Sequence, residues 1–190
     1  MRKRIATDDE LMTASARGDE AAFAELVRRH RSWVRSLTFA IVGNAEHAED
    51  LTQETFCRAY QNATRYQSQG NFTAWLKRIA VNLAKDALRS KKTAETVPVG
   101  ELHDTLVDKN GVDPLDALAS GVLREEMREA IASLPDEQRL TLAMYYFGNM
   151  SLQDVAWAMK CPVGTVKSRL FNGLRRVRQK LAAHWESEGD

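Results

Sequence analysis

The chain has 190 residues, enough for one domain or two small ones, and its 44% hydrophobic and 28% charged residues are typical of globular proteins. No apolar run approaches the roughly 18 residues of a membrane span, and no apolar stretch follows the basic N-terminus, so we expect neither a membrane span nor a secretory signal. Cys57 and Cys161 have no CxxC spacing, so we expect no disulfide framework or zinc ribbon, two thiols that serve packing, and a cytoplasmic protein.

The net charge of +1 hides an uneven distribution along the chain. Residues 1–92 carry a net charge of +5, residues 93–120 carry −5, and residues 121–190 carry +1. Within the last part, Lys160 to Lys180 holds seven basic residues and no acidic one. Such asymmetry favours a nucleic-acid partner more than the mean charge does.

Four segments of the N-terminal part have apolar residues at helical spacing. We expect helices over residues 8–16, 21–42, 45–63 and 72–89, with a loop over 64–71. Gly43 and Asn44 form a helix stop signal after the second segment. The fourth helix is expected to turn Phe72, Leu76 and Ile79 inward.

The C-terminal part is also helical in pattern. We expect helices over 121–133, from Pro135 to Gly148, over 152–159 behind a Ser151 cap, and from Val163 to about residue 185. Alternating Val, Ile and Tyr runs with hairpin turns do not occur, so strands are not expected. The predicted fold is all-α: two small helical domains, 1–92 and 121–190, joined by an acidic flexible linker, 93–120.

Residues 152–170 have the layout of a helix-turn-helix, whose second helix enters the major groove of DNA. Ala156 is small where the two helices approach, and Lys160 stands at the turn. The outward side chains suit base edges and phosphates; they are Thr165, Lys167, Ser168, Arg169, Phe171, Asn172, Arg175 and Arg176. The alternative is an ordinary helical hairpin with a solvated basic face.

A second basic face lies on the predicted helix 72–89. Arg78, Asn82, Lys85 and Arg89 share one side of it, and Tyr66, Gln67 and Asn71 lie in the loop before it. Basic side chains beside aromatic rings and amides suit unpaired bases. The alternative is a solvated face over a core that contains Trp75.

An acidic face on the predicted helix 45–63 consists of Glu46, Glu49, Asp50, Gln53 and Glu54. It is a solvated surface, a docking surface for a basic partner, or part of a metal-dependent nuclease site. The four histidines are scattered, and GxSxG, GxGxxG and GxxxxGK[ST] motifs do not occur. We therefore expect no bound metal, no cofactor and no nucleophilic catalysis.

Three stretches resemble one family in order and spacing. They are AEDLTQETF at 48–56, FTAWLKRIAVN at 72–82 and CPVGTVKSR at 161–169, and RGDEAAF at 17–23 also fits. Together they resemble a bacterial RNA polymerase sigma factor of the extracytoplasmic-function group. The similarity covers about residues 8–92 and 122–182.

The resemblance implies a non-enzymatic initiation factor with core RNA polymerase and promoter DNA as partners, and an anti-sigma factor as its regulator. Domain 1–92 would be sigma region 2 and domain 121–190 sigma region 4, with the acidic linker in the polymerase cleft. Core docking would fall to Glu49, Asp50, Gln53 and Glu54. The −10 element would be held by Tyr66, Gln67, Asn71, Arg78, Asn82, Lys85 and Arg89. The −35 element would be read by Thr165, Lys167, Ser168, Arg169, Phe171, Asn172, Arg175 and Arg176.

Two other functions stay open at this point. A free-standing helix-turn-helix regulator would bind duplex DNA alone, and it would leave the acidic face and the loop before residue 72 without a purpose. A metal-dependent nucleic-acid enzyme would use Glu46, Glu49 and Asp50, and a chelator would abolish its activity.

Overall fold

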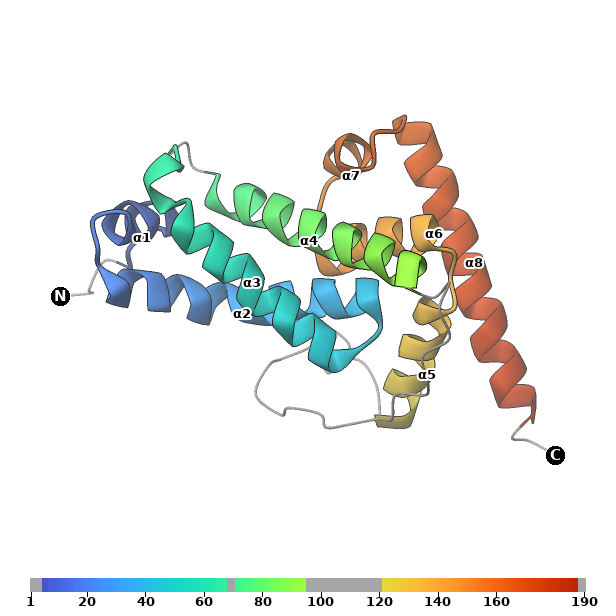
Figure 1. Ribbon diagram of the computed structural model, residues 1–190. Coiled ribbons are helices and arrows are strands. Elements are labelled where there is room, and N and C mark those ends of the chain that lie inside the picture. Colours follow the sequence, from blue (N-terminus) through green and yellow to red (C-terminus); the bar gives the residue numbers. More distant parts are fainter. Residues whose placement is uncertain (1–4, 68–70, 95–120, 188–190) are drawn as a thin grey trace.

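The computed structural model describes residues 5–67, 71–94 and 121–187, and the regular elements within these ranges are all helical (Figure 1). The all-α prediction is confirmed. The predicted linker lies outside the described residues except for 93 and 94, which belong to helix α4. No helix in the described ranges is long and apolar enough to cross a membrane.

The N-terminal domain contains α1 (Asp8–Ser15), α2 (Glu20–Val42), α3 (Ala45–Gln61), the short 3-10 helix η1 (Ala63–Arg65) and α4 (Phe72–Ala94). Side chains define where these helices begin and end: Asp19 caps α2, Asn44 caps α3, and Gly43 closes α2 in the left-handed conformation with φ 72°. The Gly43–Asn44 stop predicted from the sequence is confirmed.

The C-terminal domain contains α5 (Gly121–Ala132), α6 (Asp136–Leu142), the π-helical turn η2 (Ala143–Phe147), α7 (Leu152–Met159) and α8 (Val163–Ser187). The sequence predicted one continuous helix up to Gly148. Instead α6 widens at Ala143, because the Gly148 amide donates a hydrogen bond of 2.9 Å to the Ala143 carbonyl, five residues back. A Cβ at Gly148 would lie 2.7 Å from the Met144 carbonyl oxygen, so this turn requires glycine.

Helices α7 and α8 form the predicted helix-turn-helix. Val155 and Val166 are fully buried between them, and Ala156 is also buried. Lys160 takes the left-handed conformation at the turn, with φ 51°. Gly173 brings α8 close to α6, since a Cβ there would lie 2.6 Å from Leu142 Cδ1.

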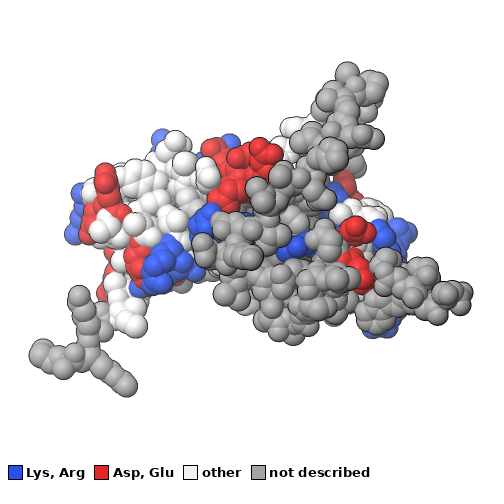
Figure 2. Space-filling model, turned by 90° about the horizontal axis from the view of Figure 1, so that it is seen from below, with Lys and Arg blue, Asp and Glu red and all other residues white. Residues whose placement is uncertain are grey.

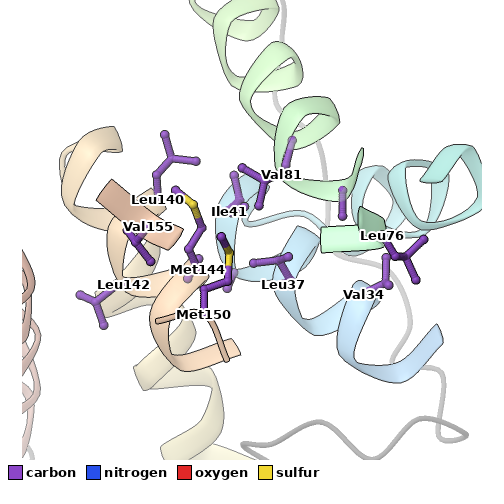
Figure 3. Close-up of a cluster of buried hydrophobic side chains, with 14 of the residues drawn as sticks. Val34, Leu37, Ile41, Leu76, Val81, Leu140, Leu142, Met144, Met150 and Val155 are labelled. Carbon is purple, nitrogen blue, oxygen red and sulfur yellow. The ribbon is translucent and has the colours of Figure 1, made fainter. Parts of the chain in front are cut away.

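One hydrophobic core runs through both domains. In Figure 3, Leu37 and Ile41 from α2 lie among Met144, Met150 and Leu140 of the C-terminal domain. The sequence left the relative placement of the domains open, and this shared core fixes it. It also explains why Val81, which the helical pattern did not assign to the core, is buried at 2% exposure.

Candidate nucleic-acid interface

The outward face of α8, called the recognition face below, lies open to solvent. Phe171 is 68% exposed although it is a large apolar side chain, and Lys167, Ser168, Arg175 and Arg176 are exposed beside it. Thr165 and Asn172 are half-buried at its edge. A helix that presents basic, hydroxyl and aromatic groups in this way can reach base edges and phosphates in a major groove.

Arg169, also predicted to contact DNA, is held inside the domain. Its guanidinium forms an ion pair with Glu137 of α6 and lies 3.5 Å from Cys161 Sγ at the turn. Its side chain is only 19% exposed. The contact of Arg169 therefore joins α8 to α6. In this respect Arg169 differs from the seven other residues that were predicted to contact duplex DNA.

A pocket of about 240 Å³ lies between α3, η1 and α4. Trp75, Ile79 and Asn82 line it from α4, and Arg58, Asn62 and Arg65 line it from the other side. Trp75 packs against the hydrophobic core as predicted, and it is half-buried and also lines the pocket. Sequence analysis identified Asn82 but missed Arg58 and Asn62, which lie before the predicted loop, and Arg65, which lies within it. Their alternation of cation and amide is the only sequence signal that could have found them.

Tyr66 is fixed between the N-terminal helix and the pocket. Its hydroxyl donates a hydrogen bond to Asp9, and its ring lies 5.0 Å from the Trp75 ring and 6.0 Å from that of Phe72. Burial, followed by the Asp9 contact, raises the pKa of the Tyr66 hydroxyl. Gln67 and Asn71 are exposed on either side of residues 68–70, which lie outside the described ranges.

A buried histidine supports the same aromatic cluster. His30 Nε2 lies 2.7 Å from an Asp8 carboxylate oxygen, and the Trp33 indole N–H donates to His30 Nδ1 at 2.9 Å. Since Nδ1 accepts, Nε2 carries the proton and donates to Asp8. Helix α1 is thereby tied to α2, and through Asp9 to Tyr66.

The basic face of α4, defined here as Lys77, Arg78, Asn82, Lys85 and Arg89, faces the C-terminal domain over part of its length. Lys77 Nζ donates to the Asn149 carbonyl and Lys85 Nζ to the Ala158 carbonyl, each at 2.8 Å. Burial lowers the pKa of both ammonium groups. Asn82 stays exposed, and Arg89 lies 4.0 Å from Asp86.

The acidic face predicted on α3 divides into two parts. Glu49 pairs with Arg31 at 2.7 Å and Arg35 at 3.5 Å, so it joins α3 to α2. Asp50, Gln53 and Glu54 are exposed, and Glu54 pairs with Arg58 at 2.6 Å on the same helix. Figure 2 views the whole molecule from below and shows acidic and basic side chains lying near one another on that side.

Two predictions about chemistry at this helix have a structural outcome. In the ranges that the structure describes, no group of three or more His, Cys, Asp or Glu side chains is placed to hold a metal ion, so Glu46, Glu49 and Asp50 do not converge. Cys57 is exposed on α3, and the expectation that it is a packing residue is wrong; Cys161 is half-buried at the helix-turn-helix turn.

Two family models match the chain, each within one domain. The model of Sigma-70 region 2 matches residues 26–94, and that of Sigma-70 region 4 matches residues 124–177. Together they cover more than half of the chain, and each contains one of the two basic faces described above.

Curated proteins and solved structures agree with these matches. The chain is 34% identical to the ECF RNA polymerase sigma factor SigW of Bacillus subtilis, over 87% of this chain and 91% of that protein. It is 30% identical to the RNA polymerase sigma-H factor of Pseudomonas aeruginosa, over 92% and 93%. Its fold is similar to that of CnrH in complex with the cytosolic domain of CnrY, with a TM-score of 0.65 and 20% identity. The match covers 93% of this chain and 97% of that chain. The fold is also similar to that of the sigma factor RpoE in complex with the anti-sigma factor NepR from Bartonella quintana, with a TM-score of 0.64 and 20% identity. That match covers 84% of this chain and 96% of the other.

Proposed function

The chain belongs to the extracytoplasmic-function sigma factors, which direct bacterial RNA polymerase to promoters, and we propose that its three polar surfaces divide that work as follows. The observation that carries the proposal is the arrangement of two separate nucleic-acid faces and one acidic face on one chain. It suits a factor that holds DNA at two places and a polymerase at a third. The domains are 1–92 as region 2 and 121–190 as region 4, joined by the acidic segment 93–120.

Docking to core RNA polymerase falls to the exposed part of the acidic face. Asp50, Gln53 and Glu54 project from α3 and can pair with a basic partner surface. Glu49, which is held by Arg31 and Arg35, keeps α3 in register with α2 and supports this surface from behind.

The −10 element is held as a single strand at the pocket between α3, η1 and α4. An unpaired base can stack on Trp75 and receive hydrogen bonds from the Asn62 and Asn82 amides. Arg58 and Arg65 supply positive charge for the flanking phosphates. Tyr66, Gln67 and Asn71 border the entrance, while Arg78, Lys85 and Arg89 follow the strand along α4.

The −35 element is read as duplex by the recognition face of α8. Phe171 can contact a thymine methyl, Asn172 can pair with adenine, and Lys167 can reach guanine. Arg175 and Arg176 are positioned for phosphates. Ser168 and Thr165 lie at the N-terminal end of the helix, where a recognition helix meets base edges.

The chain itself is a non-catalytic factor, and the polymerase carries out the chemistry. Because its partners are core polymerase and promoter DNA, we place it in the cytoplasm. One matched structure is a sigma factor in complex with an anti-sigma factor, and we propose that a protein of that class also binds this chain.

Co-elution with bacterial core RNA polymerase tests the proposal. The full chain should co-elute with core polymerase, and Glu54→Arg should abolish co-elution. Glu20→Arg, a charge reversal at an exposed position on α2, is the matched control and should bind like the parent. Absence of co-elution, combined with tight and salt-sensitive binding of duplex DNA by the chain alone, would favour the free-standing regulator instead.

The role given to Asn82 has its own test. Asn82→Ala should weaken the capture of single-stranded DNA by the complex with core polymerase, and it should leave core binding intact. A collapse of core binding would contradict the placement of Asn82 on the DNA side.

A further inference from the structure

One arginine of the basic run on α8 is turned away from the recognition face. Arg169 lies in sequence between Ser168 and Leu170, and its side chain is only 19% exposed. One terminal nitrogen of its guanidinium forms an ion pair with Glu137 in the first turn of α6. The other terminal nitrogen lies 3.5 Å from Cys161 Sγ, at the turn before α8. This single side chain therefore connects α8, the turn and α6.

The side of α8 that contains Arg169 packs against the rest of its domain. Val166 is fully buried, and Gly173 approaches α6 so closely that a Cβ there would lie 2.6 Å from a leucine side chain of that helix. Arg169 follows Val166 by three residues and precedes Gly173 by four, so the three positions share one side of α8. Phe171, at the centre of the recognition face, projects from the opposite side. A rotation of α8 about its axis would therefore shift the recognition face.

Among the contacts on the packed side, the ion pair is the directional one. Burial of apolar surface is non-directional, so the contacts of Val166 and Gly173 restrict a small rotation of α8 less sharply than a hydrogen-bonded contact does. A charge-assisted hydrogen bond depends on angle. The planar guanidinium of Arg169 is restricted further, because both of its terminal nitrogens have contacts. The contact with Glu137 is thus the one best suited to define the rotation of α8.

The same ion pair is expected to contribute little to stability. The Glu137 side chain is 66% exposed, and ion pairs at the surface are weakened by water and by the rotamer freedom that both side chains lose. Orientation is more demanding, since side chains that recognise a ligand have to be held within about 0.5 Å of the productive geometry. A contact that is weak in energy but precise in geometry suits that task.

We propose that Glu137 and Arg169 are positioning residues for duplex recognition: their ion pair orients the first turns of α8, so that the exposed side chains reach the base edges while Arg169 itself does not touch the DNA. The proposal deepens the proposed function and rests on it for the identity of the duplex-binding face. The basic run of α8 then has two uses, one toward DNA and one toward α6. Loss of either partner should have the same effect on sequence preference.

Selection from a duplex library tests this assignment. The full chain in complex with core RNA polymerase is allowed to select from duplexes with a randomised, promoter-length window. The preference for the enriched duplex over one with its upstream block scrambled is then measured by competition. Glu137→Ala, Arg169→Ala and the double variant should each lower this preference about fivefold or more, which corresponds to roughly one lost base contact. The three losses should be equal, because the ion pair is absent from all three variants.

Two controls separate positioning from charge and from direct contact. Glu129→Ala removes another exposed acidic side chain of the same domain and should keep the preference of the parent. On one mixed-sequence duplex, Arg169→Ala should keep the parent's slope of log K against log salt concentration, whereas Arg176→Ala should reduce it by about 1. Because the preference is a ratio measured on one protein, partial unfolding of a variant lowers both affinities equally and does not change it.

Three results would overturn the proposal. In the first, Glu137→Ala keeps the preference of the parent, whether or not Arg169→Ala lowers it. In the second, the double variant loses more than either single variant, so that the two residues act independently. In the third, Arg169→Ala reduces the salt slope as Arg176→Ala does, which would place Arg169 on a phosphate. Failure of the parent to co-elute with core polymerase would contradict the proposed function alone, and the same competition with the full chain by itself would still test the ion pair.

Discussion

The two basic faces of this molecule differ in how accessible they are. On α8, Phe171, Lys167 and Arg176 project into solvent, and a DNA duplex could approach them without any rearrangement. On α4, Lys77, Arg78 and Lys85 are engaged by α7 and its flanking turn. The face proposed for duplex DNA is open, whereas the face proposed for single-stranded DNA is covered in part, with Asn82 and Arg89 still exposed. This difference suggests an order in which duplex contact precedes strand capture.

The largest expected effect comes from the core that keeps the α4 face covered. Met144 is fully buried, so Met144→Ala should lower the free energy of unfolding by about 2–5 kcal/mol. Because Met144 packs against α2 as well as its own domain, hydrogen exchange should accelerate in α2 and in α6 together. The measurements are denaturant unfolding and hydrogen exchange of the full chain.

Leu174→Ala is the control for this prediction, since Leu174 is 41% exposed on α8 and outside the shared core. It should change stability by less than about 1 kcal/mol. Loss of protection in the C-terminal domain alone, with α2 unchanged, would show that the two domains do not share a core in solution. The contrast between a covered and an open face would then disappear.

The next effect concerns the support that α1 gives to the pocket proposed for the −10 strand. Tyr66→Phe removes the hydrogen bond to the Asp9 carboxylate and should lower the free energy of unfolding by about 1–2 kcal/mol. Trp75 lies against the Tyr66 ring, so its fluorescence should report a looser pocket wall. Asp9→Asn should have a similar effect, since an amide is a weaker acceptor than a carboxylate.

The same residue predicts an alkaline dependence. The pKa of Tyr66 is raised in the folded chain, so its contribution to stability is complete below about pH 10, the ordinary tyrosine value, and is lost as pH rises above it. The stability difference between the parent and Tyr66→Phe should therefore shrink above about pH 10. A difference that grows with pH would contradict the buried, hydrogen-bonded hydroxyl.

Two arginines on α8 sharpen the description of the open face. Arg169→Ala removes the ion pair with Glu137 and should cost about 1 kcal/mol of stability, a modest value because Glu137 is largely exposed. Arg176→Ala should leave the free energy of unfolding unchanged and weaken binding to all duplex sequences. It should also reduce the slope of log K against log salt concentration by about 1, because one phosphate contact is lost. Isothermal denaturation and salt-dependent duplex binding distinguish the two. A reversed pattern would place Arg169 on the DNA and Arg176 in the fold.

Local sequence patterns predicted the helices well because each signal acts within a few residues. The Gly43 stop, the Ser151 cap and the buried Ala156 between α7 and α8 are examples. Contacts between distant residues were not predictable from spacing. Nothing near Arg169 in sequence indicates Glu137 as its partner, and nothing near Arg78 indicates Trp157. Of the residues that line the pocket, the sequence predicted Asn82, because it lies on the basic face of α4. Arg58 and Arg65 were not predicted, because they come from α3 and η1, which precede that helix.

The smallest expected effect lies at the turn between α7 and α8, beside the covered face. Lys160 is a non-glycine residue in the left-handed conformation, with φ 51° and ψ 46°. Lys160→Gly should raise the free energy of unfolding by about 0.5–1 kcal/mol, because glycine adopts this conformation without steric cost. Thermal unfolding measures the gain. Lys160→Ala keeps the unfavourable backbone and should give none of it.

The two variants also separate backbone strain from charge at the α4–α7 contact. Lys160 is one of the positive charges that lower the pKa of Lys85, so both substitutions remove a repulsion between the domains. Both should slow the acetylation of Lys85 by acetic anhydride, because loss of the neighbouring positive charge raises the pKa of its ammonium group, while only the glycine variant should gain stability through the turn. If Lys160→Ala stabilises the chain as much as Lys160→Gly, repulsion across the interface outweighs the strain at the turn. The basic face of α4 would then be more sensitive to nearby charge than the basic face of α8.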